Sequence, residues 1–159
     1  MNSKINITTI SMGQPLEFKL TEKDRWVGEL LSELCEDLTQ KELEELPDRP
    51  YLTINGWLTR VHNPQFKEHV LIDGTLQTLF GAQCTRSGKP MLDSMKFQIN
   101  GVIIEGLLCE DLGYSEETEL FVGEQMRELF CMSRNFFDLK EIVHELLYLM
   151  KNPYPSMDT

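Results

Sequence analysis

The chain has 159 residues, of which 41% are hydrophobic and 26% charged, a composition typical of a globular protein and unlike that of a disordered chain. Its length suits a single domain, residues 1–159, that buries about two-thirds of the surface exposed by the unfolded chain. The net charge of −11 makes the average surface a poor binder of nucleic acid, because phosphates are repelled, and it attracts basic proteins.

The sequence lacks a membrane-spanning pattern, since no apolar run approaches the ~20 residues that such a helix needs. The N-terminal segment also lacks the apolar core of a secretory signal. We therefore expect a soluble, cytoplasmic protein with no membrane partner. The cysteines, at positions 35, 84, 109 and 131, are too widely spaced for the short-range pairs of a zinc site, so we expect reduced thiols and no cofactor.

Two strands and a helix are predicted in the N-terminal third of the chain. Alternating polar and apolar residues predict one strand within residues 2–10 and a second over residues 16–20. Thr21 then opens a predicted amphipathic helix near residues 22–38. The glutamate-rich residues 40–46 extend that helix or form a second one, and they present either a solvated face or a docking surface for a basic partner.

The middle of the chain shows the period of two that is typical of strands. Residues 51–99 predict three strands, joined by a turn at residues 62–65 and a loop at residues 86–90. Gly74, inside one of these strands, indicates a β-bulge or a close approach of two backbones. An Asn-Gly pair at residues 100–101 predicts a further turn, followed by another short strand. Strands joined by short turns most simply form an antiparallel meander.

The C-terminal third ends in the most regular predicted element. Residues 106–118 predict a loop with exposed carboxylates, and residues 119–136 match neither the helical nor the strand period. Asp138 predicts an N-cap, with Glu141 completing a capping box, for an amphipathic helix over residues 139–151. Together the elements predict an α+β fold, an antiparallel meander of about five or six strands with an N-terminal and a C-terminal helix packed on it.

Two patterns near the C-terminus suggest a functional role. His144-Glu145 matches the start of the zinc-protease motif, but Tyr148 stands where the second histidine belongs, so we expect a surface pair instead of a metal site. Phe136 and Phe137, next to an arginine, either stack on a nucleic-acid base or anchor the last helix in the core. The core role is the one that we expect for them.

Cys84 is the candidate nucleophile of the chain. A cysteine nucleophile needs an adjacent base, and the histidines nearest in sequence are His62 and His69. An enzyme would draw on Cys84, His62 and Asp73, although no reaction can be named from these residues. We expect no catalytic residue and treat an enzyme as one alternative.

Short motifs between residue 74 and the C-terminus resemble the YceD family, the large ribosomal RNA subunit accumulation proteins. Gly74-Thr75-Leu76 is similar to the Gly-x-Leu strand of that family, and Cys84-Thr85-Arg86 to the start of its Cys-x-Arg-Cys pattern. The residues that match its C-terminal helix and tail are Asp138, Leu139, Glu145, Leu147, Leu149 and Pro155. The resemblance covers most of the chain and implies an N-terminal strand and helix, a β region and a C-terminal helix.

The chain departs from the family pattern at three places. Ser87 replaces the second cysteine of Cys-x-Arg-Cys, and Asn152 replaces the first proline of the final pattern. Ser156 and Asp158 stand where a cysteine is often found near the C-terminus of the family. If the family's cysteines bind zinc, the resemblance therefore implies that this chain has lost the site and that Cys84 is structural.

The resemblance implies a role in the synthesis, processing or stability of large-subunit ribosomal RNA, without catalysis. Because the chain is acidic, we expect it to bind a basic ribosomal protein or a large-subunit assembly intermediate. The loop that carries Arg86 and Lys89 is expected to touch ribosomal RNA phosphates. The alternative is an acidic secretion chaperone, usually dimeric, that holds an unfolded effector segment along exposed hydrophobic patches. The oligomeric state is left open.

Overall fold

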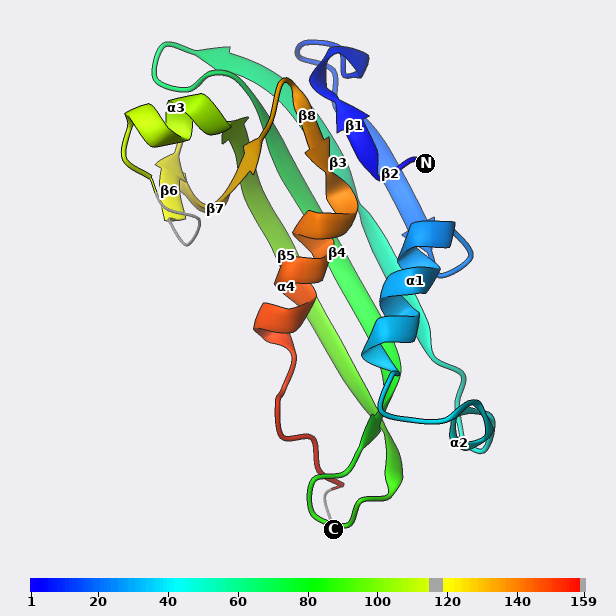
Figure 1. Cartoon of the computed structure of the whole chain (residues 1–159). Coiled ribbons are helices and arrows are strands. Elements are labelled where there is room, and N and C mark those ends of the chain that lie inside the picture. The colour runs from blue at the N-terminus through cyan, green and yellow to red at the C-terminus, as the bar shows by residue number, and fades with distance from the viewer. Residues whose placement is uncertain (115–118, 158–159) are drawn as a thin grey trace.

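The computed structural model of the chain describes residues 1–114 and 119–157. In these residues a mixed sheet of six strands carries the helices α1 and α4 on one face, and a two-stranded sheet lies close to the N-terminus (Figure 1). The predicted α+β class, with an N-terminal and a C-terminal helix on a sheet, is confirmed.

The described elements include three strands that are much longer than the rest. In chain order they are β1 (Lys4–Asn6), the 3-10 turn η1 (Ile7–Thr9), β2 (Leu16–Thr21), α1 (Arg25–Leu34), α2 (Gln40–Glu44), β3 (Tyr51–Asn63), β4 (Lys67–Gln83), β5 (Pro90–Glu105), α3 (Gly106–Asp111), β6 (Glu119–Val122), β7 (Gln125–Met132), β8 (Phe136–Asp138) and α4 (Leu139–Met150).

The strand order in the large sheet is β2-β3-β4-β5-β7-β6. The first four strands form the predicted antiparallel meander, but β7 runs parallel to β5, so the sheet is mixed. The chain leaves β5 through α3, runs back along the edge as β6, and turns again over Gly123 and Glu124 into β7. Two reversals of direction bring β7 beside β5 in the same orientation, which the meander prediction did not include.

The main core lies between the sheet and the two helices. Alternate residues of β3 and β4 point to the helices, and they are almost all apolar and buried: Leu52, Ile54, Leu58, Val70, Ile72, Leu76 and Phe80. The buried residues of α1 and α4 close this core from above: Trp26, Val27, Leu30, Leu34, Leu139, Ile142, Val143, Leu146 and Leu147. Burial of these stripes holds both helices on the same face.

The predicted helix near residues 22–38 is shorter than expected. Thr21 is the last residue of β2, and the N-cap of α1 is Asp24, whose carboxylate accepts a hydrogen bond from the Thr21 backbone at 2.9 Å. The helix ends at Leu34, and a separate helix, α2, follows. A complete capping box between Thr39 and Glu42 starts α2 and separates it from α1.

The turn predicted at residues 100–101 is wrong, because β5 continues through it without a break. Gly101 is required there by packing. A Cβ atom on this residue would lie 2.6 Å from Ile72 Cγ2 and 2.9 Å from Phe130 Cε2. The glycine thus marks a close contact with side chains of the two flanking strands, and the short strand expected after it is the end of β5.

The segment predicted as a loop at residues 106–118 begins with α3, and the predicted exposure of Glu116 and Glu117 lies outside the described residues. Together α3, β6 and β7 help to bury a second, smaller apolar cluster, whose members are Phe66, Val102, Ile104, Cys109, Leu120 and Leu129. At the N-terminus, the predicted strand within residues 2–10 is only β1, which pairs with β8.

Candidate functional site

The loop between β4 and β5 is closed by its own backbone at the far end of the sheet from the N-terminus (Figure 1). The Cys84 N–H donates to the Lys89 carbonyl at 2.9 Å, and the Gly88 N–H donates to the Cys84 carbonyl at 2.8 Å. Gly88 has a φ of 71°, a left-handed conformation that glycine adopts at little cost. The loop is therefore a fixed turn that presents Arg86 and Lys89 to solvent.

The C-terminal tail docks on this loop. The Pro155 carbonyl accepts hydrogen bonds from the Thr85 N–H at 2.9 Å and from the Thr85 hydroxyl at 3.0 Å. The Met157 N–H donates to the Cys84 sulfur at 3.5 Å. Two of the motifs singled out in the sequence, Cys84-Thr85-Arg86 and Pro155, are thus in direct contact although 70 residues separate Thr85 from Pro155.

The sulfur of Cys84 is the acceptor at the centre of this contact. Hydrogen bonds from the Ser87 hydroxyl, and then from backbone N–H groups of Met157, Ser87 and Arg86, lower the pKa of the thiol to about 6. The side chain is buried, with 3% of its surface exposed, so the stabilised thiolate faces the protein. Ser87 therefore donates a hydrogen bond to Cys84 at the place where the family pattern has a second cysteine.

The remaining predicted site residues lie elsewhere. Gly74 pairs with Gly56 in the β3–β4 ladder without a bulge, and a Cβ on Gly74 would lie 2.5 Å from the Asn55 carbonyl oxygen, so the predicted close approach is confirmed. Asp138 caps α4 by accepting a hydrogen bond from the Lys140 N–H at 3.0 Å. Leu139 is fully buried in the main core. Leu139, Gly74 and Asp138 therefore have structural roles.

Glu145, the last of the predicted site residues outside the loop, lines a groove between α4 and β7. The groove has a partly apolar floor and carboxylates from α4 at its rim, and its lining residues are Leu129, Phe130, Cys131, Phe137, Asp138, Glu141, Ile142 and Glu145. Next to it on β7, burial and the neighbouring carboxylates of Glu119 and Glu145 raise the pKa of Glu128. A cation placed here would relieve this repulsion.

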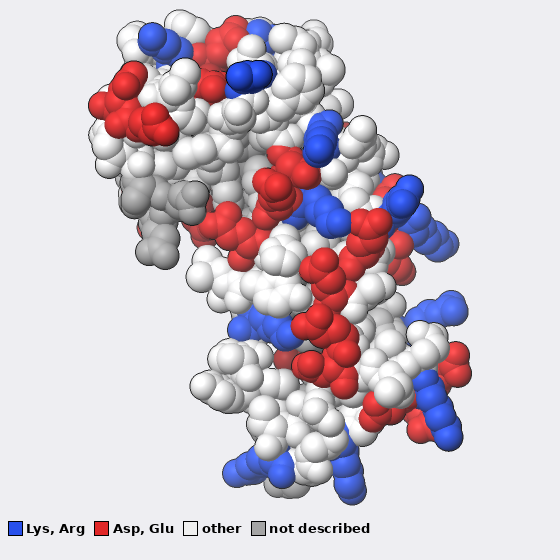
Figure 2. All heavy atoms as spheres, in the orientation of Figure 1, with Lys and Arg blue, Asp and Glu red and all other residues white. Residues whose placement is uncertain are grey.

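Acidic side chains also gather over α1 and α4, with a few cations among them (Figure 2). Some of these carboxylates are partnered across the two helices. Glu29 contacts Lys140 at 2.5 Å, and this hydrogen-bonded pair lowers the pKa of Glu29 and raises that of Lys140. Other carboxylates of the same face, at Glu36, Asp37 and Glu141, are exposed to solvent. We call this group of helix-side carboxylates, Glu29, Glu36, Asp37 and Glu141, the acidic face.

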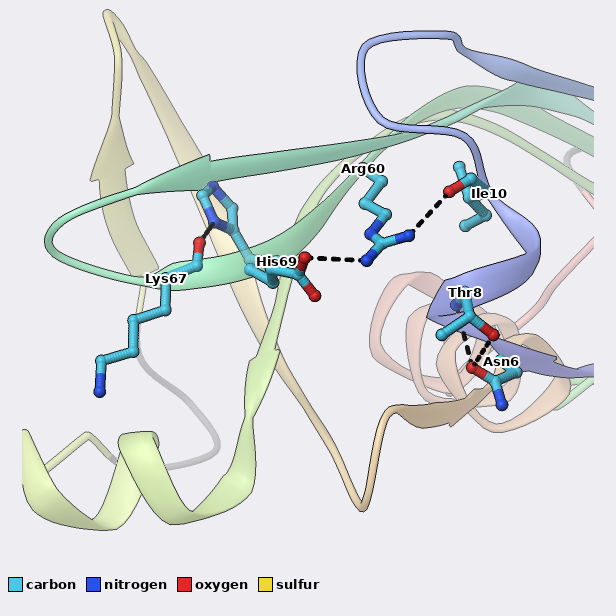
Figure 3. A network of polar contacts seen from close by, with 7 residues as sticks. Asn6, Thr8, Ile10, Arg60, Lys67 and His69 are labelled. Carbon is cyan, nitrogen blue, oxygen red and sulfur yellow. Dashed lines mark hydrogen bonds and ion pairs between the residues drawn. The ribbon is translucent and has the colours of Figure 1, made fainter.

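His62 and His69 do not meet Cys84. Both lie near the β3–β4 turn, 15 or more residues along the sheet from Cys84, a separation of about 50 Å in an extended strand. His69 is buried, its Nδ1 lies 2.8 Å from the Lys67 carbonyl oxygen, and burial lowers its pKa (Figure 3). Arg60 occupies the same region, bonded to Glu68 at 2.8 Å. The Cys–His pair of the enzyme alternative is therefore not assembled in this structure.

The two C-terminal patterns also resolve into structural contacts. His144 lies 3.2 Å from a Glu33 carboxylate oxygen and packs on the Tyr148 ring at 4.6 Å between centroids. Among residues 1–114 and 119–157, no group of three or more His, Cys, Asp or Glu side chains is arranged to hold a metal. Phe137 is buried in the main core as predicted, whereas Phe136 is half exposed.

Two features of the site were missed by the sequence reasoning. Arg127 is buried, forms an ion pair with Asp73 at 3.0 Å and donates a hydrogen bond to the Gly101 carbonyl at 3.1 Å. Asp73 is therefore the ion-pair partner of a buried arginine. Cys109 and Cys131 bring their sulfur atoms to 3.0 Å. Neither contact has a local signal, because each depends on the crossover that places β7 beside β5.

Comparison of the chain with protein-family models, with curated proteins and with solved structures found no match. No helix within the described part of the chain has the length and apolar character to span a membrane. The features of the structure that bear on function are therefore the acidic face and the contact between the β4–β5 loop and the C-terminal tail.

Proposed function

We propose that this chain is a non-enzymatic, cytoplasmic factor that supports the synthesis, processing or stability of large-subunit ribosomal RNA. It does so by binding a basic ribosomal protein or a large-subunit assembly intermediate. The resemblance of the Cys84 loop and the C-terminal helix to the YceD family supplies the ribosomal part of the proposal. The acidic composition of the chain is the reason to expect a positively charged partner.

The observation that carries the proposal is the group of exposed carboxylates on the helix face and beside β7. Carboxylates lie on α1, on α4 and at the groove beside β7, and Arg86 and Lys89 are exposed on the β4–β5 loop. A basic protein bound on the helix face meets complementary charge, and the exposed cations of the loop can contact RNA phosphates carried by that protein. This arrangement suits a partner that carries RNA better than it suits bare RNA.

A pull-down from cell lysate at low and at high salt tests the proposal, with mass spectrometry and RNA sequencing of the retained material. We expect ribosomal proteins of the large subunit to be retained at low salt and released at high salt, because exposed ion pairs are screened. Retention of no ribosomal protein at either salt concentration would reject the ribosomal role.

The alternative, an acidic secretion chaperone, draws support from apolar side chains on the last turn of α4. Leu149 and Met150 are 67% and 52% exposed. A chaperone of this kind is expected to be a stable dimer that does not associate with ribosomes. Light scattering combined with ribosome sedimentation therefore separates the two candidates.

A further inference from the structure

β5 has a free backbone edge over most of its length. It pairs with β4 from Pro90 to Ile103, but on its other side it pairs with β7 only from Gly101 to Glu105. Within the described residues, no strand pairs with the outer side of residues 90–100 (Figure 1). An open edge of this length is a template for an additional strand.

The orientation of the edge amides follows from one hydrogen bond. The Ser94 N–H donates to the Asp93 carboxylate at 2.9 Å and so points away from the β4 ladder. Amides alternate in direction along an antiparallel strand, and the N–H groups of Lys96 and Gln98 therefore point to the same open side. These three donors, with the carbonyls of the same residues, are the groups that an added strand would engage.

The end of the open edge coincides with the acidic groove. Gly101 pairs with Glu128, so Glu128 stands where the β5–β7 ladder stops and the free edge begins. The Gly101 carbonyl accepts a hydrogen bond from Arg127 Nη1 at 3.1 Å. Glu141 and Glu145 line the groove beside this point. A chain that continues along β5 toward β7 therefore reaches three carboxylates.

Apart from Asp93, the inward-facing side of residues 91–99 is apolar. Met95 and Phe97 are partly buried and pack against the main core, to which Leu146 and Leu147 of α4 also belong. On the last turn of the same helix, Leu149 is 67% exposed. Lysine and arginine side chains suit such a surface, because their aliphatic stems cover apolar area while their charged ends reach carboxylates.

We propose that residues 91–99 of β5 bind an extended, lysine- or arginine-rich segment of the partner as an additional strand, with its cationic side chains directed at Glu128, Glu141 and Glu145. The inference rests on the proposed function for the basic nature of the partner. It adds the place and the mode of binding, main-chain pairing at a sheet edge with charge complementarity at one end.

The test uses the full chain and a defined probe, an acetylated nine-residue peptide that alternates lysine and valine. Its controls are a peptide that alternates glutamate and valine, and a lysine–valine peptide with N-methyl groups on all of its backbone amides, which cannot pair as a strand through either edge. We expect only the unmodified lysine peptide to bind. At ten times its dissociation constant, it should slow amide exchange of Ser94, Lys96 and Gln98 by about ten-fold.

Side-chain variants separate charge from main-chain pairing. Each of Glu128→Gln, Glu141→Gln and Glu145→Gln should weaken binding of the lysine peptide by about two- to five-fold, the range of a single exposed ion pair. The matched control Glu110→Gln removes an exposed carboxylate from α3 and should leave the affinity unchanged. Lys96→Pro removes one outward N–H and should abolish the exchange protection. A circular dichroism spectrum like that of the wild type shows that the proline variant is folded. If the variant does not fold, the N-methyl peptide tests main-chain pairing instead.

Three results would overturn the inference. Equal binding of the N-methyl peptide would show that charge alone suffices. Protection from amide exchange that is confined to residues outside β5 would place the site elsewhere. A dimer whose β5 amides are protected without peptide would show that the edge pairs with a second copy of the chain. Failure of this inference is distinct from failure of the ribosomal role. Retention of ribosomal proteins without edge protection rejects only the edge, and edge binding without such retention rejects only the role.

Discussion

Cys84 is a hydrogen-bond acceptor that joins the β4–β5 loop to the C-terminal tail. Its lowered pKa, about 6, comes first from the Ser87 hydroxyl and then from backbone N–H groups, which stabilise the thiolate. An unfolded chain loses these donors, and its thiol returns to the ordinary value near 8.5. Between these two pKa values the unfolded chain binds a proton that the folded chain has lost, so folding becomes more favourable as pH rises.

We therefore expect the free energy of unfolding to gain a contribution from Cys84 that is absent below pH 6 and grows up to about pH 8.5. Cys84→Ala should lack this contribution, and Ser87→Ala, which keeps the thiol but removes its main donor, should reduce it. Urea unfolding at a series of pH values measures the difference. Parallel pH profiles for the wild type and Cys84→Ala would contradict the assignment.

Cys109 and Cys131 are the pair of thiols closest to forming a bond, with sulfur atoms 3.0 Å apart. Burial raises the pKa of Cys109 to about 12, while Cys131 is exposed, so an oxidant meets Cys131 first. With hydrogen peroxide, Cys131 becomes a sulfenic acid and releases water. The Cys109 sulfur then displaces a second water and closes a disulfide.

The expected product has lost two hydrogen atoms and retains two of its four thiols, Cys35 and Cys84. Peptide mapping by mass spectrometry identifies the linked pair. Cys131→Ser should leave Cys109 in the thiol form under the same treatment. A product in which Cys35 or Cys84 is oxidised before Cys131 would show that exposure and proximity do not govern the reaction.

Gly74 belongs to a position where two strands approach too closely for a side chain. Its Cβ would lie 2.5 Å from the Asn55 carbonyl oxygen and 3.2 Å from Gly56 Cα. Gly74→Ala should therefore lower the free energy of unfolding by about 1–3 kcal/mol, the usual range for overpacking. Gly106→Ala is the comparison, because its nearest contact is a carbonyl oxygen at 3.2 Å. Urea denaturation of both variants measures the difference, and an equal, small effect would contradict the close approach.

The C-terminal helix is the element whose start is best defined. Asp138 accepts from the Lys140 N–H at 3.0 Å, the second residue of the helix. The cap residue was predicted correctly, although its bond goes to Lys140 and not to the predicted Glu141. Asp138→Ala should destabilise the protein by about 1 kcal/mol, whereas Asp138→Ser keeps an oxygen acceptor and should retain most of the stability. Thermal unfolding of the two variants provides the test, and equal loss in both would show that an oxygen acceptor at this position does not account for the stability.

Periodicity identified the elements that are governed by local patterns. The apolar stripe of α4 and the alternation in β3, β4 and much of β5 are properties of short windows, and these elements appear where the sequence places them. Glycine was the main source of error, because Gly101 was interpreted as a turn and is a packing requirement for Ile72 and Phe130. Ile72 and Phe130 are both too far from Gly101 in the sequence for a local pattern to include them.

The parallel pairing of β5 with β7 had no signal in the sequence. It depends on where β6 and its two-residue turn return the chain, which involves residues more than twenty positions from Gly101. The contact of Cys84 with the tail is not among the predictions from the sequence, which treat the two motifs separately. Its geometry, with Pro155 bonded to Thr85, came from the structure.

Across the molecule, acidic residues outnumber basic ones, which gives the net charge of −11. The helix face and the groove beside β7 carry some of the carboxylates, and the β4–β5 loop carries Arg86 and Lys89. The free edge of β5 ends at the acidic groove. In the proposed function the basic segment binds to a surface that is already formed, so no change of fold is needed.

The most direct test of the proposed binding is sedimentation of the purified chain with precursors of the large ribosomal subunit at low salt. We expect the wild type in the precursor fractions and the triple variant Glu128→Gln, Glu141→Gln, Glu145→Gln near the top of the gradient. A control with equal loss of charge, Glu110→Gln, Asp111→Asn, Glu124→Gln, should sediment like the wild type. A wild-type chain that stays at the top, or a triple variant that sediments with the precursors as fully as the wild type, would contradict binding of a basic assembly component through the acidic groove.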